Sequence, residues 1–402
     1  MITNTTTAHL TSEQIEEFGR ELDSMREEVI DSRGERDRSY ILRLIRIQRS
    51  LALAGRLWIF ASLLFLPAWR SGLAGGAAFW GVLVAGVLML ALAKILENME
   101  IGHNILHAQW DWMMDPDVQS STWEWDHACP SDQWMHSHNV VHHTWTNVHG
   151  KDRDIGYGML RVTDDQRWHP FYVLNPLNAV MMALFFEWFI CLHDLELNKM
   201  VAGKKSFARV RRLLVGIWHK VLRQARKDFV LWPALGAVLA LPLASVGAGP
   251  SPLAVLLIVM AANAAACIVR NVWTFVIIFC GHFPSGVHHF PREAVDGETR
   301  GGWYLRQLLG SCNIEGGPTF HVLSGNLSHQ IEHHLFPDLP SNRYPELAPR
   351  VRALAVRYGL PYNTGSLTRQ FGSTMANIVR LSLPLQGPAW MGASGTRRQR
   401  SI

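Results

Sequence analysis

Three clusters of histidines are the residues of this sequence whose type and spacing best suit chemistry. Their patterns are His103-x3-His107, His138-x3-His142-His143 and His329-x3-His333-His334. In a helix, residues four apart lie on one face, so the histidines of each cluster can point at a common centre. Neutral imidazole binds iron, zinc, copper and nickel, so the clusters indicate a metal site.

The number of histidines indicates two metal ions rather than one. His143 and His334 each follow another histidine directly, which places them about 100° further round a helix and lets each doublet serve two neighbouring ions. A catalytic zinc ion needs only three protein ligands. Two centres with open positions suit oxygen-activating iron, and the clusters lack the Glu-x-x-His pattern of carboxylate-rich di-iron bundles.

Four apolar segments, which we expect to be membrane-spanning helices, must position these clusters. They run near residues 51–69, 73–92, 229–247 and 253–280, and each is long enough to cross a hydrocarbon core of about 30 Å. Short turns join the first to the second and the third to the fourth, so we expect two hairpins. The apolar stretch 171–195 contains Glu187 and His193, so we expect it to lie at the membrane surface or under the catalytic cap rather than to cross the membrane.

The length of the fourth segment adds His282 to the candidate ligands. Residues 253–280 would be about 42 Å long as one helix, about 12 Å more than the hydrocarbon core, which places His282 beyond the membrane. A helix continuing past Lys94 would raise His103 by roughly 13 Å on the same side.

The basic residues indicate on which side of the membrane the histidine clusters lie. Arg43, Arg46 and Arg49 precede the first segment, and a run of Lys and Arg between residues 204 and 227 precedes the third. By the positive-inside tendency, both termini and the histidine clusters are cytoplasmic. We therefore expect a cytoplasmic N-terminal helical arm (1–50) with a capping box at Thr11, a membrane domain (51–360) and a cytoplasmic C-terminal tail (361–402).

Composition excludes several other classes of protein. Of the 402 residues, 48% are hydrophobic and 18% charged, which is too apolar for a disordered chain. The five cysteines are scattered without a CxxC pair, so neither a disulfide framework nor a thiolate zinc site is indicated. The net charge of +5 arises from basic runs beside the apolar segments, so we expect no nucleic-acid binding.

The histidine motifs resemble those of the integral-membrane fatty-acid desaturases and hydroxylases. The segments that carry the resemblance are GHNILHAQWDW, HSHNVVHHTWTNV and NLSHQIEHHLFPDLP, within residues 50–360. The resemblance implies an all-α membrane protein, with four transmembrane helices in two hairpins and a cytoplasmic helical cap that holds a di-iron centre. It also implies dioxygen as oxidant and the conversion of a fatty-acyl chain, on coenzyme A or a lipid, to a cis alkene.

The resemblance assigns roles to individual residues. The implied metal ligands are His103, His107, His138, His142, His143, His282, His329, His333 and His334, and all of these except His282 and His329 form the implied catalytic set. Helical spacing favours His329 in the third motif, whereas its QIEHH form favours Gln330. The His-Pro-Gly-Gly haem motif is absent from this sequence, so we expect electrons from NAD(P)H through a separate ferredoxin or flavin and haem carrier.

The same motifs are also compatible with other functions. A hydroxylase or oxygenase on the same scaffold is the nearest alternative, followed by a membrane zinc hydrolase and a non-catalytic receptor. Four carboxylates are candidates for orienting the histidine rings, namely Asp111, Asp126, Asp154 and Glu332. We expect His288 and His289 to lie on the surface, and His193 to support the site rather than bind metal.

Overall fold

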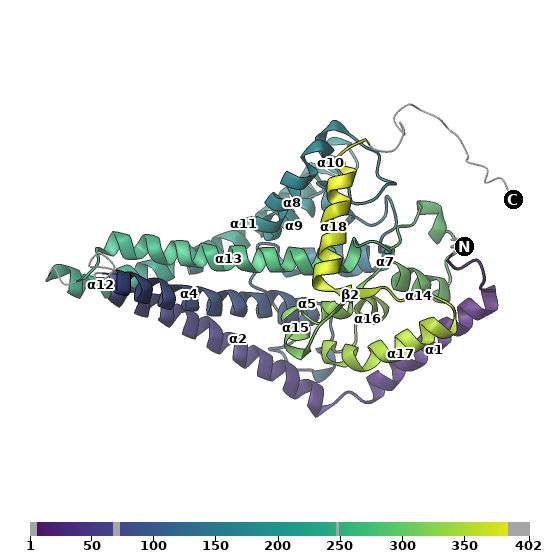
Figure 1. The fold of residues 1–402 in the computed structure, drawn as a ribbon, viewed down its shortest axis with the longest axis horizontal. Helices are drawn as coiled ribbons and strands as arrows, with labels where there is room; N and C mark the ends of the chain where they lie inside the picture. The colour runs from purple at the N-terminus through teal and green to yellow at the C-terminus, as the bar shows by residue number, and fades with distance from the viewer. Residues whose placement is uncertain (1–5, 67–72, 247–248, 385–402) are drawn as a thin grey trace.

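The computed structural model describes residues 6–66, 73–246 and 249–384, and these residues are mostly helical. One pair of short parallel strands, β1 (Asn313–Glu315) and β2 (Thr364–Ser366), interrupts the helices. Figure 1 shows long helices side by side toward a narrow end and shorter helices gathered at a broad end. The helical fold expected from the sequence is therefore confirmed, apart from this strand pair.

Four long helices form the narrow end. α2 (Glu35–Ser62) packs along α4 (Leu73–Ile95), and α12 (Trp232–Ser245) packs along α13 (Pro252–His282), which also contacts α4 (Figure 1). Two helical stretches, Gly75–Leu106 and Pro252–His282, are long and apolar enough to cross a membrane. The arrangement of four crossing helices in two hairpins stays a prediction.

A bent pair of helices is the third candidate for a membrane span. α8 (Asn175–Leu184) and α9 (Phe186–His193) belong to two apolar stretches that meet at an angle of 102°. Glu187 lies in the first turn of α9 and pairs with Arg270 of α13 at 2.5 Å, so its charge is neutralised inside the protein. The expectation that this segment lies at the membrane surface or under the cap stays a prediction.

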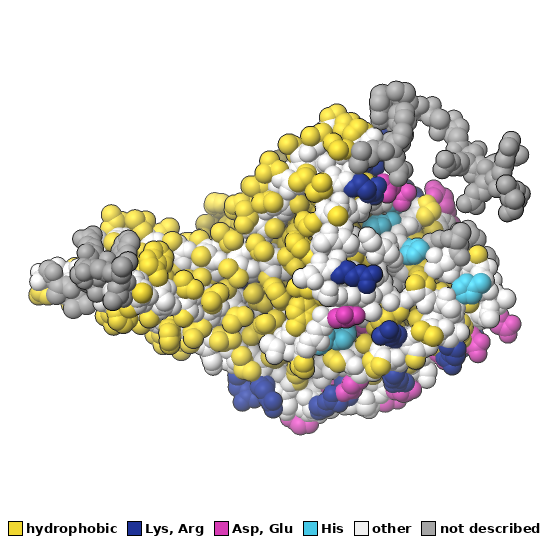
Figure 2. Space-filling model, in the orientation of Figure 1, with side chains coloured by type: hydrophobic (Ala, Val, Ile, Leu, Met, Phe, Trp, Pro, Cys, Tyr) yellow, Lys and Arg dark blue, Asp and Glu magenta, His cyan; other side chains and the backbone are white. Residues whose placement is uncertain are grey.

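The surface changes character along the molecule. Figure 2 shows hydrophobic side chains covering the narrow end, whereas acidic, basic and histidine side chains gather on the broad end. Exposed large side chains on the long helices include Leu57, Trp80, Leu88, Leu239 and Leu257. A contiguous apolar surface of this kind on long helices is typical of contact with lipid.

The N-terminal arm begins as the sequence predicts. α1 (Ser12–Asp31) starts after Thr11, whose side chain and that of Gln14 form a capping box. The helix then packs against α14 (Arg300–Leu309) and α17 (Tyr344–Arg357). The other α-helices are α5 (His103–Leu106), α6 (Ser131–Met135), α7 (His143–Trp145), α10 (Leu197–Val201), α11 (Phe207–Ala225), α15 (Pro318–Leu323), α16 (Gln330–Leu335) and α18 (Leu367–Leu381).

The expected division into three parts stays a prediction. α2 runs unbroken through residue 50, and α18, within the expected tail, packs against α13 and α8. Parts of the sequence-based expectations lie outside the described residues, namely the end of the first expected span with the turn that follows it, the start of the turn between the third and fourth spans, and the end of the C-terminal tail.

Two glycines set the distance between α2 and α4. A Cβ atom at Gly55 would lie 2.7 Å from the Leu90 nitrogen, and one at Gly86 would lie 2.8 Å from the Ile59 nitrogen. Both distances are shorter than real Cβ contacts, so the two backbones touch where these glycines lie. Small residues allow such close helix approaches in membranes.

We expect the substitution Gly86→Leu to force α2 away from α4 and to lower the free energy of unfolding by about 1–3 kcal/mol. Thermal unfolding of the detergent-solubilised protein measures the effect. Gly81→Leu is the matched control, because a Cβ at Gly81 of the same helix meets nothing within 4 Å. Equal stability of the two variants would contradict the close approach.

Candidate metal centre

The first histidine motif lies where α4 leaves the apolar part of the fold. α4 continues through the π-helix η2 (Leu96–Gly102) into α5, which begins with His103, and His107 ends the helix. Both side chains are buried, with 6% of their surface exposed. One nearly continuous helix therefore carries this motif from the narrow end to the broad end.

The second motif lies on a π-helix rather than an α-helix. η4 (His136–His142) contains His138 and His142, and His143 begins α7 directly after it. The i to i+5 hydrogen bonds of a π-helix alter the angle between successive side chains, and single π turns are frequent at functional sites. The α-helical spacing inferred from the sequence therefore describes the backbone of this motif only approximately.

The third motif is divided by a break in the backbone. α16 begins at Gln330, and His329 precedes it in a non-helical conformation at φ −101° and ψ 53°. His329 and His333 therefore do not share one helical face. The His329 ring lies 4.5 Å from the ring of His321, and its Nδ1 lies 3.9 Å from Glu332.

Gln330, rather than His329, lies beside the converging histidines. Its Nε2 lies 3.0 Å from Nε2 of His282. Its side chain packs directly against Gly281, where an added Cβ atom would lie only 2.9 Å from Cγ of Gln330. The structure thus brings Gln330 to the cluster, whereas His329 belongs to neither group of converging histidines described below. The helical argument for His329 does not hold, because its backbone is not helical.

Four histidines form a first group. Single ring nitrogens of His103, His107, His138 and His333 all lie within 4.8 Å of one another. Nε2 of His103 lies 3.3 Å from Nε2 of His333. The ring of Trp134 stacks on His138 at 4.3 Å and also touches His103, so it covers one side of the group.

Three further histidines form a second group beside the first. Nitrogens of His142, His282 and His334 lie within 4.8 Å of one another, and Nε2 of His334 is 3.3 Å from Nε2 of His282. The doublet of His333 and His334 is therefore divided between the two groups, as the sequence suggested. His143 lies between them, with its ring 4.8 Å from His333 and 4.3 Å from His334.

Hydrogen bonds orient two rings of the second group. Nδ1 of His142 lies 3.1 Å from a carboxylate oxygen of Asp152, to which it donates. Nδ1 of His334 lies 3.0 Å from Oε1 of Gln307, whose amide nitrogen donates to the His143 carbonyl. Because Gln307 accepts at this oxygen, the proton of His334 is on Nδ1. The Nε2 lone pairs of both rings are left for a metal.

A tyrosine orients His333 in the first group. The Tyr344 hydroxyl donates to the Phe336 carbonyl and lies 3.4 Å from Nδ1 of His333, which therefore donates to it. Nε2 of His333 is again left unprotonated and faces His103. Sequence reasoning missed Asp152, Gln307 and Tyr344. Asp152 lies ten residues after His142 and Tyr344 ten residues after His334, whereas Gln307 lies near no motif.

Burial keeps most of these rings neutral. It lowers the pKa of His138, His143, His333 and His334 well below the ordinary value. Burial acts in the same direction on His142, but the Asp152 carboxylate outweighs it and raises the pKa of that ring. Neutral imidazole is the form that binds metal.

Several ring nitrogens of the converging histidines have no partner within the described part of the protein and are therefore available to a metal. Nε2 of His107, Nε2 of His138, Nδ1 of His282 and both nitrogens of His143 are buried without a hydrogen-bond partner. An unsatisfied buried polar group costs about 1–3 kcal/mol, so such a concentration calls for a bound partner. Donors that are all imidazole suit a transition metal.

Comparisons with known proteins give the family of this chain. A family model described as fatty acid desaturase matches residues 77–366. The chain is 46% identical to the NADPH-dependent stearoyl-CoA 9-desaturase of Mycobacterium tuberculosis over 377 residues, which cover 94% of this chain and 82% of that protein. The chain belongs to the fatty-acid desaturase family. The family predicted from the histidine motifs is confirmed.

More distant relatives are also desaturases. The sn-1 linoleoyl-lipid 6-desaturase of Synechocystis sp. is 25% identical over 320 residues, with 76% of this chain and 80% of that protein covered. The acyl-lipid (7-3)-desaturase of Rebecca salina is 29% identical over 263 residues, with 62% and 53% covered. The present chain is thus an acyl desaturase and an oxidoreductase. Its apolar helices and its family associate the desaturase with a membrane.

A narrow cavity reaches the histidines of the desaturase. His103, His138, His142 and His282 line one part of it, and the side chains of Phe186, Ile190, Ile278 and Leu327 line another. Its volume is about 50 Å³, room for a few water-sized molecules but far below the roughly 300–1,000 Å³ of pockets for larger ligands. A long ligand must therefore displace some of these side chains.

The four carboxylates expected to orient the rings have different surroundings in the desaturase. Asp154 lines the cavity and lies 3.8 Å from Nδ1 of His142, and burial raises its pKa to about 7. Glu332 accepts from Asn313 and Tyr362 behind the third motif. Asp111 instead binds Ser120, and Asp126 pairs with Lys94 and Lys227.

The remaining histidines lie outside the two groups. His193 ends α9 and lines the cavity, with its Nε2 4.0 Å from Asp154. His288 and His289 are half-buried in the loop after α13 rather than fully exposed. The supporting role expected of His193 stays a prediction.

Proposed function

We propose that this desaturase introduces a cis double bond into a long fatty-acyl chain at two iron ions held by the two histidine groups. His103, His107, His138 and His333 would hold one ion, and His142, His282 and His334 the other, with His143 between them. The observation that carries the proposal is the convergence of eight imidazoles, seven of them buried and several with orphaned nitrogens. Bound iron would supply, with dioxygen, the oxidising power to remove two hydrogens from unactivated methylenes.

The residues around the histidines prepare this chemistry. Asp152, Gln307 and Tyr344 hold protons on Nδ1 of their partner rings, so that each Nε2 keeps its lone pair at the centre. Trp134 covers the first group and limits access of water. Gln330 offers an amide group beside His282, so we propose that Gln330 rather than His329 is the residue of the third motif that belongs to the site.

We further propose that the acyl chain lies in the cavity beside the histidines. The aromatic and aliphatic side chains of Phe186, Ile190 and Ile278 match a hydrocarbon chain, which is bound by burial of apolar surface. The Mycobacterium tuberculosis relative is named for stearoyl-CoA, so a saturated acyl chain of that class is the first substrate to test. Binding would widen the cavity by moving its apolar side chains.

The proposed setting is a bilayer crossed by four helices. α2 with α4, and α12 with α13, would form two hairpins, with both termini and the histidine groups in the cytoplasm. Support comes from the apolar narrow end and the charged broad end in Figure 2. Electrons would come from NAD(P)H through a separate carrier, in keeping with a relative named NADPH-dependent.

Expression in a host that lacks the activity tests this function. We expect mass spectrometry of the fatty acids to show a new product two hydrogens lighter than its precursor, and metal analysis to show about two iron ions per chain. A product that has gained one oxygen would indicate a hydroxylase instead. About one zinc ion per chain, with activity that needs no dioxygen, would indicate a hydrolase.

A further inference from the structure

A second and larger hollow lies on the other side of Trp125 from the histidine cavity. Its volume is about 520 Å³, and it is lined by residues of α2, α4, η2, the loop at residues 124–126, α11, the π-helix η7 (Arg226–Leu231) and α12. Trp125 lines both the hollow and the histidine cavity. Its ring stacks on His127 at 4.4 Å, and its indole nitrogen donates to the Cys129 carbonyl.

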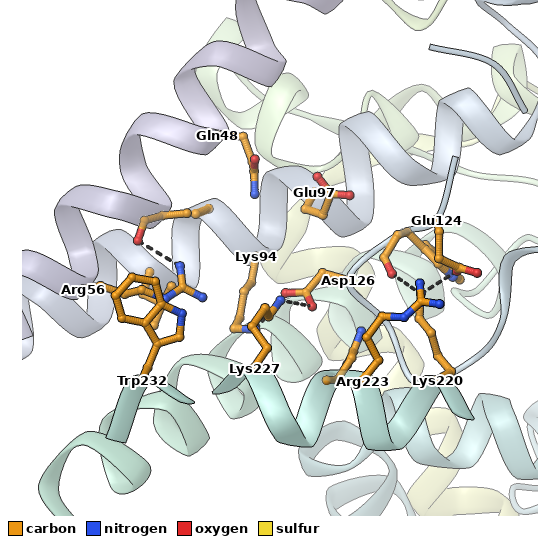
Figure 3. Close-up of a pocket in the computed structure, with 15 residues that line it drawn as sticks. Gln48, Arg56, Lys94, Glu97, Glu124, Asp126, Lys220, Arg223, Lys227 and Trp232 are labelled. Carbon is orange, nitrogen blue, oxygen red and sulfur yellow. Dashed lines mark hydrogen bonds and ion pairs between the residues drawn. The ribbon is translucent and has the colours of Figure 1, made fainter. Parts of the chain in front are cut away.

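Cationic side chains dominate the walls of this hollow. Lys220, Arg223 and Lys227 rise from one helix toward Glu124, Asp126 and Lys94 (Figure 3). Their spacing of three and four residues places them on one helical face. The cations that line the hollow are Arg56, Lys94, Lys220, Arg223 and Lys227, and the carboxylates are Glu97, Glu124 and Asp126.

Most of these cations already have carboxylate partners. Lys94 lies 2.8 Å from Asp126 and 2.7 Å from Asp228, which stands just behind the wall. Lys227 pairs with Asp126 at 2.7 Å, and Lys220 pairs with Glu124. Even with Asp228 included, the carboxylates are one fewer than the cations.

Arg223 is the cation left over. Among the described residues, no carboxylate lies within 4.0 Å of its guanidinium, although the side chain lines the hollow. Its positive charge adds to burial in lowering the pKa of Lys220, so the two cations lie close enough to repel each other. An anion placed between them would remove this repulsion.

The position of the hollow suits the head of a lipid-like molecule. Lys94 ends the apolar helix α4, and Arg56 stacks on Trp232 with 4.8 Å between the guanidinium and the ring. Tryptophan and basic residues of this kind mark the level of lipid headgroups. A hydrocarbon chain attached to a head at this level would have to pass the buried Trp125 to enter the histidine cavity.

We propose that this hollow binds a phosphate group of the molecule that carries the acyl chain, between Arg223 and Lys220. The inference rests on the proposed function, because it requires an acyl substrate. The planar guanidinium of Arg223 matches phosphate oxygens with two parallel hydrogen bonds, and the Lys220 ammonium adds a point charge. Coenzyme A and phospholipid headgroups both supply such a phosphate.

Binding measurements on the full-length detergent-solubilised protein test the site. The probes are stearoyl-CoA, stearic acid, and nanodiscs containing a stearoyl phosphatidylglycerol. We expect Arg223→Gln to weaken binding of one phosphate-bearing probe about tenfold and to raise its KM without changing kcat. We expect no change for stearic acid, and partial recovery with Arg223→Lys, which keeps the charge but loses the planar fork.

Arg226→Gln is the matched control, since Arg226 is exposed like Arg223 but does not line the hollow. An effect confined to stearoyl-CoA assigns the phosphate to coenzyme A, and one confined to phosphatidylglycerol assigns it to a lipid headgroup. Equal affinities of the Arg223 and Arg226 variants, or equal weakening for stearic acid, would overturn the proposal. Binding that depends on Arg223 in a protein that forms no alkene would overturn the proposed function instead.

Discussion

Replacement of His333 by alanine is expected to abolish alkene formation and to remove iron from the protein. Nε2 of His333 faces His103 at 3.3 Å, and its ring lies within 5.0 Å of the rings of His103, His107 and His143. Residues that only support a ligand contribute about 10–100-fold to metal affinity or activity. Loss of a ligand itself should therefore reduce activity by more than about 100-fold.

The matched control for this variant is His329→Ala, four residues away in the same motif. The His329 ring contacts His321 and Glu332 instead of the two groups, so we expect this variant to retain its iron and most of its activity. Iron content per chain and the yield of unsaturated acid, measured on both variants, decide the matter. If His329→Ala loses iron as completely as His333→Ala, the assignment of the third motif to Gln330, His333 and His334 is wrong.

The substitution Asp152→Asn is expected to lower iron affinity or activity by about 10–100-fold. Asp152 accepts from Nδ1 of His142 and from the backbone N–H groups of Asn147 and Asp154, so one carboxylate fixes both the ring and the loop. Burial raises the pKa of Asp152, but the nearby His142 outweighs it and lowers that pKa, which keeps the carboxylate ionised. Asparagine retains the shape but loses the charge that holds the proton on Nδ1.

Asp111→Asn provides the comparison for this second variant. Asp111 was an equal candidate from the sequence, yet its carboxylate binds the backbone and hydroxyl of Ser120. We expect its iron affinity, measured by competition with a chelator, to match that of the unaltered protein. An Asp152 variant that binds iron as tightly as the Asp111 variant would show that orientation of His142 does not depend on this carboxylate.

The sequence contains enough to predict the family, the helical fold and the convergence of the histidines. The matching spacing of the three motifs and the length of the apolar segment 253–280 were enough to name His282 as a partner of the motif histidines, and the structure brings it together with His142 and His334. Pattern alone could not separate His329 from Gln330, because the decision depends on where α16 begins. A break of one residue in a helix leaves no signal in helical spacing.

The residues that orient the rings were largely out of reach of the sequence. Gln307 and Tyr344 approach His334 and His333 only because α14 and α17 pack beside α16. Asp126 looked suitable beside the second motif, but it is used to neutralise Lys94 and Lys227. Contacts between distant segments require the tertiary structure, whereas the motifs themselves are local.

The π-helix at the second motif makes the length of this segment as important as its composition. η4 places His138 in one group and His142 in the other through its wider turn. Deleting a single residue between them would restore tighter winding and rotate the following imidazoles away from their partners. A sequence alignment that allows a one-residue gap between His138 and His142 would therefore treat as equivalent two second motifs whose imidazoles point in different directions.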